Sequence, residues 1–158
     1  MPTPKAAAGF TGCVCVMVAA TLLLWGQLPG YGVGRPPTLE EIESWDVIVG
    51  PEGKELPPGE GTVMAGREVF SLRCAECHGS EGQGADKGDA LVGGEGTLTG
   101  TRPLKTVGSY WPYLSTVWDY VHRSMPFGDA QSLTADEVYA ITAYILYSND
   151  IVGDDFTL

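Results

Sequence analysis

Thiol and imidazole side chains are scarce in this sequence, which limits the metal and redox chemistry open to it. The chain has 4 cysteines and 2 histidines. Cys13 and Cys15 fall inside an apolar N-terminal run, which leaves Cys74 and Cys77 for chemistry. A zinc site normally needs a second pair of ligands, and a dithiol redox motif normally lies in a βαβ pattern. Neither feature accompanies this pair, and a disulfide across two intervening residues would close too small a loop to stabilise much.

Positive charge is also sparse. The sequence has 9 Lys and Arg against 20 Asp and Glu, so its formal net charge is -11. This balance argues against nucleic acid and against an anionic membrane surface as partners. It favours docking to a basic face of a partner protein, although acidity that only maintains solubility explains it equally well.

Long apolar runs are lacking, apart from residues 13–25. A membrane span needs about 20 apolar residues, whereas a shorter run after a single cation such as Lys5 is typical of a secretory signal peptide. We assign residues 1–30 to a signal peptide and place its cleavage between Gly26 and Gly32. An uncleaved anchor over residues 10–28 is the alternative. The pattern predicts a periplasmic protein with no membrane span in its mature form.

The stretch that carries chemistry is Cys74-Ala75-Glu76-Cys77-His78. This C-x-x-C-H pattern is typical of the attachment of one covalent haem c. Each cysteine sulfur is expected to bond one haem vinyl group, and His78 to offer its imidazole to the iron. Since haem is attached to such motifs outside the cytoplasm, the motif and the predicted export support each other.

Met125 is the candidate for the second axial ligand of the iron. It lies at the mouth of a loop and precedes Pro126, which restricts it to an extended conformation outside the preceding helix. A thioether sulfur is a soft ligand that raises the potential of haem iron. His122, one helical turn earlier, is the rival ligand, and an open sixth position is the third possibility.

Four further residues are candidates for haem contacts. A ligating histidine usually donates its far ring N–H to a carbonyl, and we predict the Pro103 carbonyl in this role. Leu104 is a candidate for covering the haem edge. Tyr110 and Trp111 carry polar groups that can reach the haem propionates while their rings fill the pocket, although ordinary core filling explains them too.

Apolar spacing and capping residues predict helices on either side of a glycine-rich loop at residues 79–100. Gly66 is expected to allow a close helix crossing, with Tyr144 packed against it. The segment 46–49 is predicted to be strand-like and is followed by a turn at 51–54. The expected helices are residues 39–45, 63–73 and 135–148, and a helix that Pro112 or Tyr113 opens and that ends near Arg123.

Residues 31–61 form an extended arm rich in Pro and Gly. This arm contains too few apolar residues to form a core of its own. We expect it to wrap the haem domain or a partner subunit, with Trp45 as an anchor. A merely ordered leader is the alternative interpretation.

Several features follow one another in a telling order: Gly66 with Phe70, the Cys-x-x-Cys-His motif, Pro103-Leu104, Met125-Pro126 and Ala143-Tyr144-Ile145. In this order they resemble a class I cytochrome c over about residues 62–149. The stretches Thr106-Val-Gly-Ser-Tyr-Trp-Pro-Tyr and Arg123-Ser-Met-Pro-Phe are similar to the cytochrome subunits of Sox sulfur dehydrogenase and sulfite dehydrogenase complexes. The larger members of that group carry a second haem domain, whereas this chain has a single C-x-x-C-H and resembles the monohaem form.

The resemblance implies an all-α class I cytochrome c fold, with a few helices around the haem. It also implies a molybdenum-containing dehydrogenase subunit that does the chemistry and passes electrons to this chain. The chain would hand them to another cytochrome or an oxidase, and would be an electron-transfer subunit with no enzyme activity by itself. The expected organisation is signal peptide 1–30, arm 31–61, haem domain 62–150 and C-terminal tail 151–158.

Three alternatives stay open at this point. The chain can be a free-standing periplasmic electron carrier. It can be a haem protein whose open sixth position binds a ligand or is catalytic. It can also be a metal-binding or dithiol module without haem.

Overall fold

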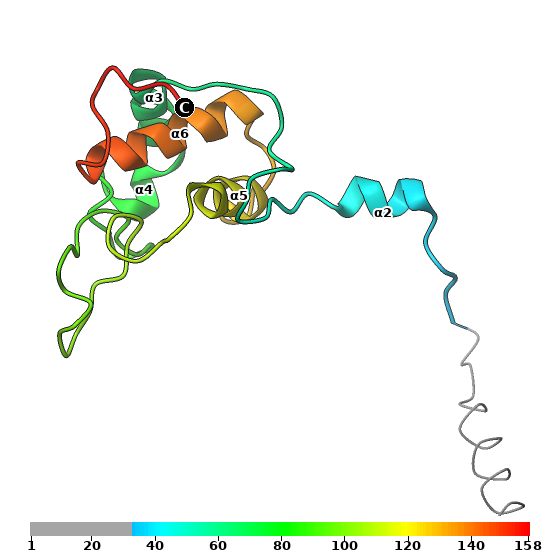
Figure 1. Ribbon diagram of the computed structural model, residues 1–158, viewed down its shortest axis with the longest axis horizontal. Helices are drawn as coiled ribbons and strands as arrows, with labels where there is room; N and C mark the ends of the chain where they lie inside the picture. Colours follow the sequence, from blue (N-terminus) through cyan, green and yellow to red (C-terminus); the bar gives the residue numbers. More distant parts are fainter. Residues whose placement is uncertain (1–32) are drawn as a thin grey trace, which may run out of the picture. The chain divides into compact units, whose positions relative to one another are not determined.

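The computed structural model describes residues 33–158, and the regular elements there are helices (Figure 1). Two isolated β-bridges but no strand occur in this part of the chain. The all-α class predicted from the sequence is therefore confirmed, whereas the predicted signal peptide lies outside the described residues. The chain consists of two units, residues 1–42 and 43–158. The helices are α2 (Leu39–Trp45), α3 (Val63–Arg73), α4 (Ala75–His78), α5 (Leu114–Ser124) and α6 (Ala135–Ser148).

Side-chain caps fix where the longer helices begin. The hydroxyl of Thr62 accepts a hydrogen bond from the Ala65 N–H at 3.2 Å and starts α3. At α6, Thr134 and Glu137 form a reciprocal capping box, in which each side chain bonds the backbone N–H of the other residue. These caps satisfy N–H groups that have no partner within the helix. The helices predicted over 63–73 and 135–148 are confirmed. The helix predicted to open at Pro112 or Tyr113 is also present, and it runs from Leu114 to Ser124, one residue beyond the expected end.

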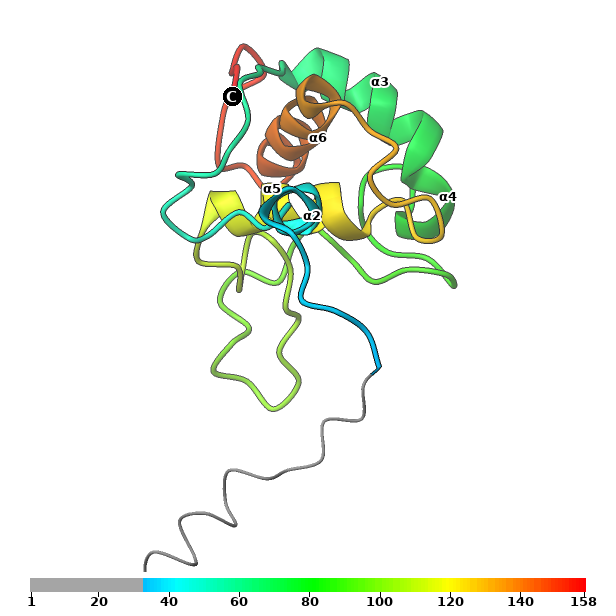
Figure 2. The same cartoon turned by 90° about the vertical axis from the view of Figure 1, so that its right-hand side faces the viewer.

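The core of the second unit is built around the crossing of α3 and α6 (Figure 2). A Cβ atom at Gly66 would lie 1.8 Å from the carbonyl oxygen of Ala140 and 2.8 Å from the Cβ of Tyr144. The two backbones touch here because Gly66 has no side chain. One turn further along α3, the rings of Phe70 and Tyr144 pack with centroids 5.1 Å apart. The predicted glycine-dependent crossing and its contact with Tyr144 are confirmed.

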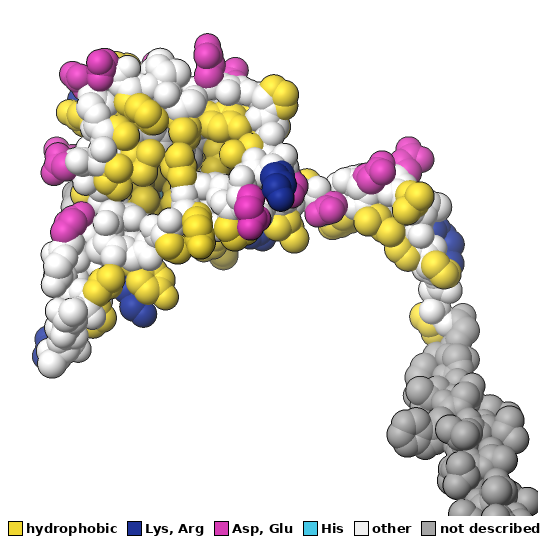
Figure 3. Space-filling model, viewed as in Figure 1, with side chains coloured by type: hydrophobic (Ala, Val, Ile, Leu, Met, Phe, Trp, Pro, Cys, Tyr) yellow, Lys and Arg dark blue, Asp and Glu magenta, His cyan; other side chains and the backbone are white. Residues whose placement is uncertain are grey.

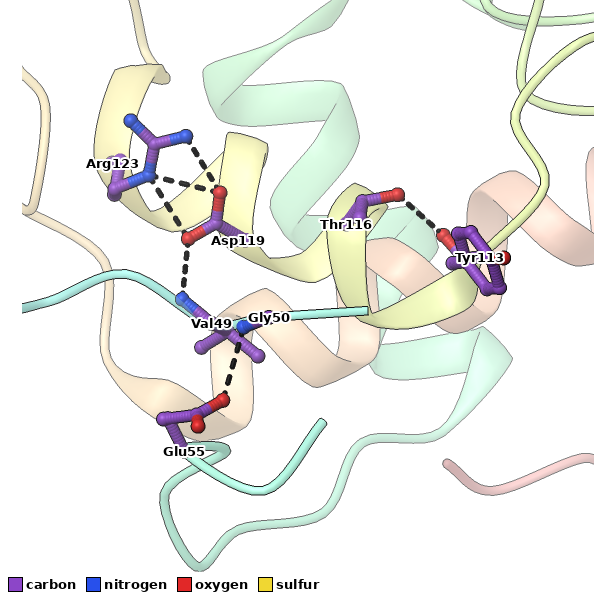
Figure 4. A network of polar contacts seen from close by, with 7 residues as sticks. All are labelled: Val49, Gly50, Glu55, Tyr113, Thr116, Asp119 and Arg123. Carbon is purple, nitrogen blue, oxygen red and sulfur yellow. Dashed lines mark hydrogen bonds and ion pairs between the residues drawn. The ribbon is translucent and has the colours of Figure 1, made fainter. Parts of the chain in front are cut away.

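The strand predicted for residues 46–49 is wrong, because this segment is coil. Val49 is 4% exposed and packs in the core. Its N–H donates to the buried carboxylate of Asp119 on α5 at 2.8 Å, so a side chain takes the bond that a neighbouring strand would make (Figure 4). The predicted turn follows, closed by a 2.9 Å bond from the Gly53 N–H to the Gly50 carbonyl.

The C-terminal end of the second unit pairs with the segment that leads into α3. Gly61 and Leu158 exchange backbone hydrogen bonds of 3.0 Å, and Thr62 bridges Thr157. Leu158 packs against the core cluster. Any side chain at position 61 would clash, because a Cβ on Gly61 would lie 2.0 Å from the backbone nitrogen of Ala140. The last residues of the chain thus hold the segment that leads into α3.

Candidate functional site

The two cysteines of the C-x-x-C-H motif lie on one helical turn. Cys74 ends α3, with its N–H bonded to the Phe70 carbonyl at 2.9 Å, and opens α4. Its own carbonyl accepts from the N–H groups of Cys77 and His78 at 3.1 and 3.0 Å. Residues three apart on a helix share a face, so the two thiols lie on one side of the turn. Both are free and half-buried.

Burial raises the pKa of the Cys74 thiol to about 11, with Arg73 acting in the opposite direction and Cys77 in the same one. The cause is desolvation, which disfavours a thiolate in apolar surroundings. Cys74 packs against the core cluster, which includes Phe70. At neutral pH the Cys74 sulfur therefore keeps its proton.

The imidazole of His78 is fixed by a backbone carbonyl. Its Nδ1 lies 2.7 Å from the Asp89 carbonyl oxygen, which makes Nδ1–H the donor and leaves the lone pair on Nε2 for a metal. We predicted the Pro103 carbonyl in this role, and that prediction is wrong. Pro103 is exposed, and the glycine-rich loop instead returns Asp89 to the ring.

Close approach of the loop at Gly88 explains this return. A Cβ at Gly88 would lie 2.9 Å from the Cys77 carbonyl oxygen and 3.1 Å from His78 Nδ1. The loop is also tied to α4 by a 2.7 Å bond from the Gly84 N–H to the His78 carbonyl. Residues 79–100 were predicted to be loop, and they are, but their first half supports the histidine through Gly84, Gly88 and Asp89.

Met125 leaves α5 in an extended conformation, with φ −122° and ψ 149°. Its N–H still bonds the Val121 carbonyl at 3.1 Å, so the helix sets where Met125 begins. The side chain is half-buried and packs against the same core cluster as Cys74. The extended conformation predicted from the following Pro126 is confirmed.

A clamp that the sequence did not reveal holds the segment after Met125. Arg73, which directly precedes the C-x-x-C-H motif, donates from Nη2 to the Asp129 carboxylate at 2.8 Å and to the Ser132 hydroxyl at 2.7 Å. The Gln131 N–H closes the same loop on the His122 carbonyl at 3.2 Å. The end of α3 and the Met125 loop are thereby joined, although Asp129 and Ser132 lie 56 and 59 positions after Arg73 in the sequence.

His122, the rival axial ligand, stacks on Trp118 with ring centroids 4.9 Å apart. The Trp118 ring packs in turn on Tyr139 of α6. His122 Nδ1 and Trp118 Nε1 are buried without a hydrogen-bond partner among residues 33–158. The structure thus places the half-buried ring of His122 against Trp118.

The remaining predicted residues divide into two groups. Trp111 packs against the core cluster and meets the Tyr120 ring edge-on, at 5.6 Å between centroids. Leu104 and Tyr110 are 45% and 55% exposed. The Leu104 carbonyl accepts a 2.7 Å bond from the Ser109 hydroxyl, which fixes the backbone there. The structure thus packs Trp111 against the core and leaves Leu104 and Tyr110 at the surface.

The donor groups fit a covalently attached haem. Two thiols share one turn, the adjoining imidazole has its Nδ1 occupied and Nε2 available, and a thioether lies in an extended segment packed on the same core. These are the groups that c-type haem requires. A zinc site needs a different set, and residues 33–158 contain no group of three or more His, Cys, Asp or Glu side chains that could hold a metal ion.

Comparison with known proteins gives consistent matches. The sequence model of the cytochrome c family matches residues 63–149. The chain is 57% identical to a chain in the crystal structure of the sulfane dehydrogenase SoxCD from Paracoccus pantotrophus, with a TM-score of 0.73 over 81% of this chain and 63% of that one. It is 27% identical over 111 residues to the thiosulfate dehydrogenase of Stutzerimonas stutzeri, covering 64% of this chain and 35% of that protein. The chain therefore spans less than two thirds of either relative.

In the described part of the chain, no helix has both the length and the apolar character to cross a bilayer.

Proposed function

The chain belongs to the cytochrome c family, and from that premise we propose that it is a monohaem electron-transfer subunit serving a sulfur-oxidising dehydrogenase. The haem c that this family binds supplies one-electron chemistry, since its iron cycles between ferric and ferrous states. The observation that carries the proposal is the single turn that presents both thiols beside an imidazole held by the Asp89 carbonyl.

In this proposal Cys74 and Cys77 tether the porphyrin. Each thiol would supply the sulfur of one thioether link, and its hydrogen would be retained in the product, so the attachment needs no oxidant. His78 offers Nε2 to the iron while Asp89 keeps the proton on Nδ1, which also raises the basicity of the ligand. Met125 would offer its thioether as the second ligand of the iron.

Electron transfer is favoured over catalysis at the iron because His78 and Met125 would both hold it. No position would then remain for a substrate, and the bound group would supply one-electron chemistry alone. The core packing of Met125 supports this choice. The chain is then not catalytic by itself. Leu104, Tyr110 and Trp111 are proposed haem contacts.

The dehydrogenase partner is inferred from the relatives. The chain resembles SoxCD at 57% identity and, more distantly, a thiosulfate dehydrogenase. We infer that a molybdenum-containing subunit oxidises a sulfur compound and passes the electrons to this chain, which delivers them to another cytochrome or an oxidase. The C-x-x-C-H motif, whose haem is attached outside the cytoplasm, supports a periplasmic location with residues 1–30 as signal peptide.

Absorption spectroscopy of the haem-loaded chain tests this function. A pyridine haemochrome spectrum should show one haem with two thioether links. The ferric protein should show the far-red methionine–iron charge-transfer band, and the ferrous protein should not bind carbon monoxide rapidly. In Met125→Ala the band should disappear and carbon monoxide should bind, while the haem stays attached.

His122→Ala is the matched control and should keep the band. A wild-type protein without the band that binds carbon monoxide at once would instead support a catalytic or ligand-binding haem. A chain that carries no haem after export with the haem-attachment machinery would refute the proposal altogether.

A further inference from the structure

Helix α2 has a face of exposed apolar side chains. Leu39 and Trp45 are 77% and 84% exposed, and Ile42 between them is 47% exposed. Residues at this spacing of three lie on one side of a helix, within an arc of about 120°. Figure 3 shows apolar side chains gathered along one side of this segment and acidic ones along another.

The helix is formed in advance, although it has just 7 residues. Isolated helices of this length are unstable in water because nucleation is costly. Here Thr38 and Glu41 form a capping box, with bonds of 3.2 Å to the Glu41 N–H and 2.8 Å to the Thr38 N–H. The Arg35 guanidinium donates two hydrogen bonds, of 2.8 and 2.5 Å, to the Glu41 carboxylate.

These contacts hold the pKa of Glu41 near 2, chiefly through the Arg35 hydrogen bonds and then through Thr38. The Glu41 carboxylate therefore stays charged, and its bonds to Arg35 persist throughout the physiological pH range. A helix that is already formed loses little conformational entropy on binding, so more of the contact energy of its apolar face appears as affinity.

The charges around this face indicate what can cover it. Glu40, Glu43 and Asp46 are exposed beside it, within a chain of net charge -11. Interfacial membrane helices carry Lys and Arg on their polar face, so this helix suits a bilayer poorly. A second copy of the chain would bring the same acidic residues together, and like charges in contact oppose association. A protein surface with an apolar groove and a basic rim is complementary on both counts.

We propose that α2 docks through Leu39, Ile42 and Trp45 into an apolar groove, rimmed by Lys and Arg, on the dehydrogenase subunit. The proposal rests on the proposed function for the identity of that subunit. An amphipathic helix in a groove is a recurrent mode of recognition, and an exposed tryptophan is a typical anchor of such contacts.

The test titrates the haem-loaded full chain against the purified molybdenum subunit and measures Kd by calorimetry. Trp45→Ala should raise Kd by about 30-fold, and the triple variant Leu39→Ala/Ile42→Ala/Trp45→Ala by about 100-fold or more. A matched control, Met64→Ala/Ile151→Ala, removes two apolar side chains that are 62% and 53% exposed elsewhere and should leave Kd within about twofold. The methionine–iron band should be unchanged in all variants, which shows that the haem domain is intact.

The outcomes separate the two proposals. A wild-type chain that binds the subunit as tightly as its triple variant refutes docking by α2 and leaves the proposed function standing. A wild-type chain that does not bind the subunit refutes the partner in the proposed function, and the docking proposal with it. Sedimentation that shows a dimer broken by the triple variant, or flotation of the wild type with anionic vesicles, would assign the face to a second copy or to a membrane instead.

Discussion

At the scale of single residues, the missing side chain of Gly66 controls how closely α3 and α6 approach. Gly66→Ala would place a methyl group 1.8 Å from the Ala140 carbonyl oxygen, which belongs to the backbone of α6 and cannot rotate away. The helices must then separate, which also loosens the contact of Phe70 with Tyr144. We expect the free energy of unfolding to fall by about 3 kcal/mol, as for other overpacked cores.

Chemical denaturation of the haem-loaded protein measures this loss. Gly50→Ala is the control, because a Cβ there meets its nearest neighbour, a Glu55 carboxylate oxygen, at an ordinary 3.4 Å. Equal stabilities of the two variants would mean that α6 shifts at little cost and that Gly66 is not required for the crossing.

At the scale of elements, Asp119 joins α5 to the coil segment that contains Val49 (Figure 4). Its carboxylate accepts from the Val49 N–H at 2.8 Å and from Arg123 at 2.6 and 2.9 Å. Burial alone would raise the pKa of Asp119, but the hydrogen bonds from Arg123 and Val49 outweigh it and hold the pKa below its usual value. The stabilising effect is therefore complete above the unfolded-state pKa of about 3.9 and is lost as the pH falls through the lower, folded-state value.

Asp119→Asn should accordingly lower the free energy of unfolding by about 2 kcal/mol at pH 7. The Asn Oδ1 can still accept from the Val49 N–H, so the loss comes from the missing charge and from the Nδ2 group that replaces the acceptor facing Arg123. The difference from wild type should shrink as the pH is lowered below about 4. Denaturation at several pH values measures it, with Asp154→Asn at an exposed position as the control; a difference that persists in acid would contradict the assignment.

Arg73 links two elements in a way that bears on the iron. Its bonds to Asp129 and Ser132 hold the loop that carries Met125 against the end of α3. In Arg73→Ala the methionine–iron band should be lost at a lower denaturant concentration than the helices, by far-ultraviolet circular dichroism, whereas in wild type the two transitions lie closer together. Arg73→Lys should restore part of the difference.

Arg67→Ala is the control for Arg73, because Arg67 lies on the same helix but stacks over Tyr144 and Tyr147, at 5.7 and 5.5 Å. It should destabilise the protein without separating the two transitions. Coincident transitions in Arg73→Ala would show that the clamp is merely structural.

Elements with their own capping residues and apolar spacing could be predicted from the sequence. Thr62 and Thr134 mark the starts of α3 and α6, and Pro126 predicts the extended Met125. The partner of His78 could not be predicted, because a backbone carbonyl carries no residue-type signal and every position in the glycine-rich loop offers one. The segment 46–49 has the composition of a strand, but it lacks a neighbouring strand, and a buried carboxylate on α5 takes its hydrogen bond instead.

At the scale of the whole molecule, the net charge of -11 should govern how the chain meets its partner. Salt shortens the reach of surface charges from about 30 Å at 0.01 M to about 8 Å at 0.15 M. If the acidity steers the chain toward a basic surface, the association rate with the molybdenum subunit should fall about tenfold over that range, while the dissociation rate changes little. Stopped-flow mixing at a series of salt concentrations measures both rates, and Glu40→Gln/Glu43→Gln should reduce the slope without touching the haem domain. A rate that does not respond to salt would mean that the acidic residues maintain solubility and take no part in recognition.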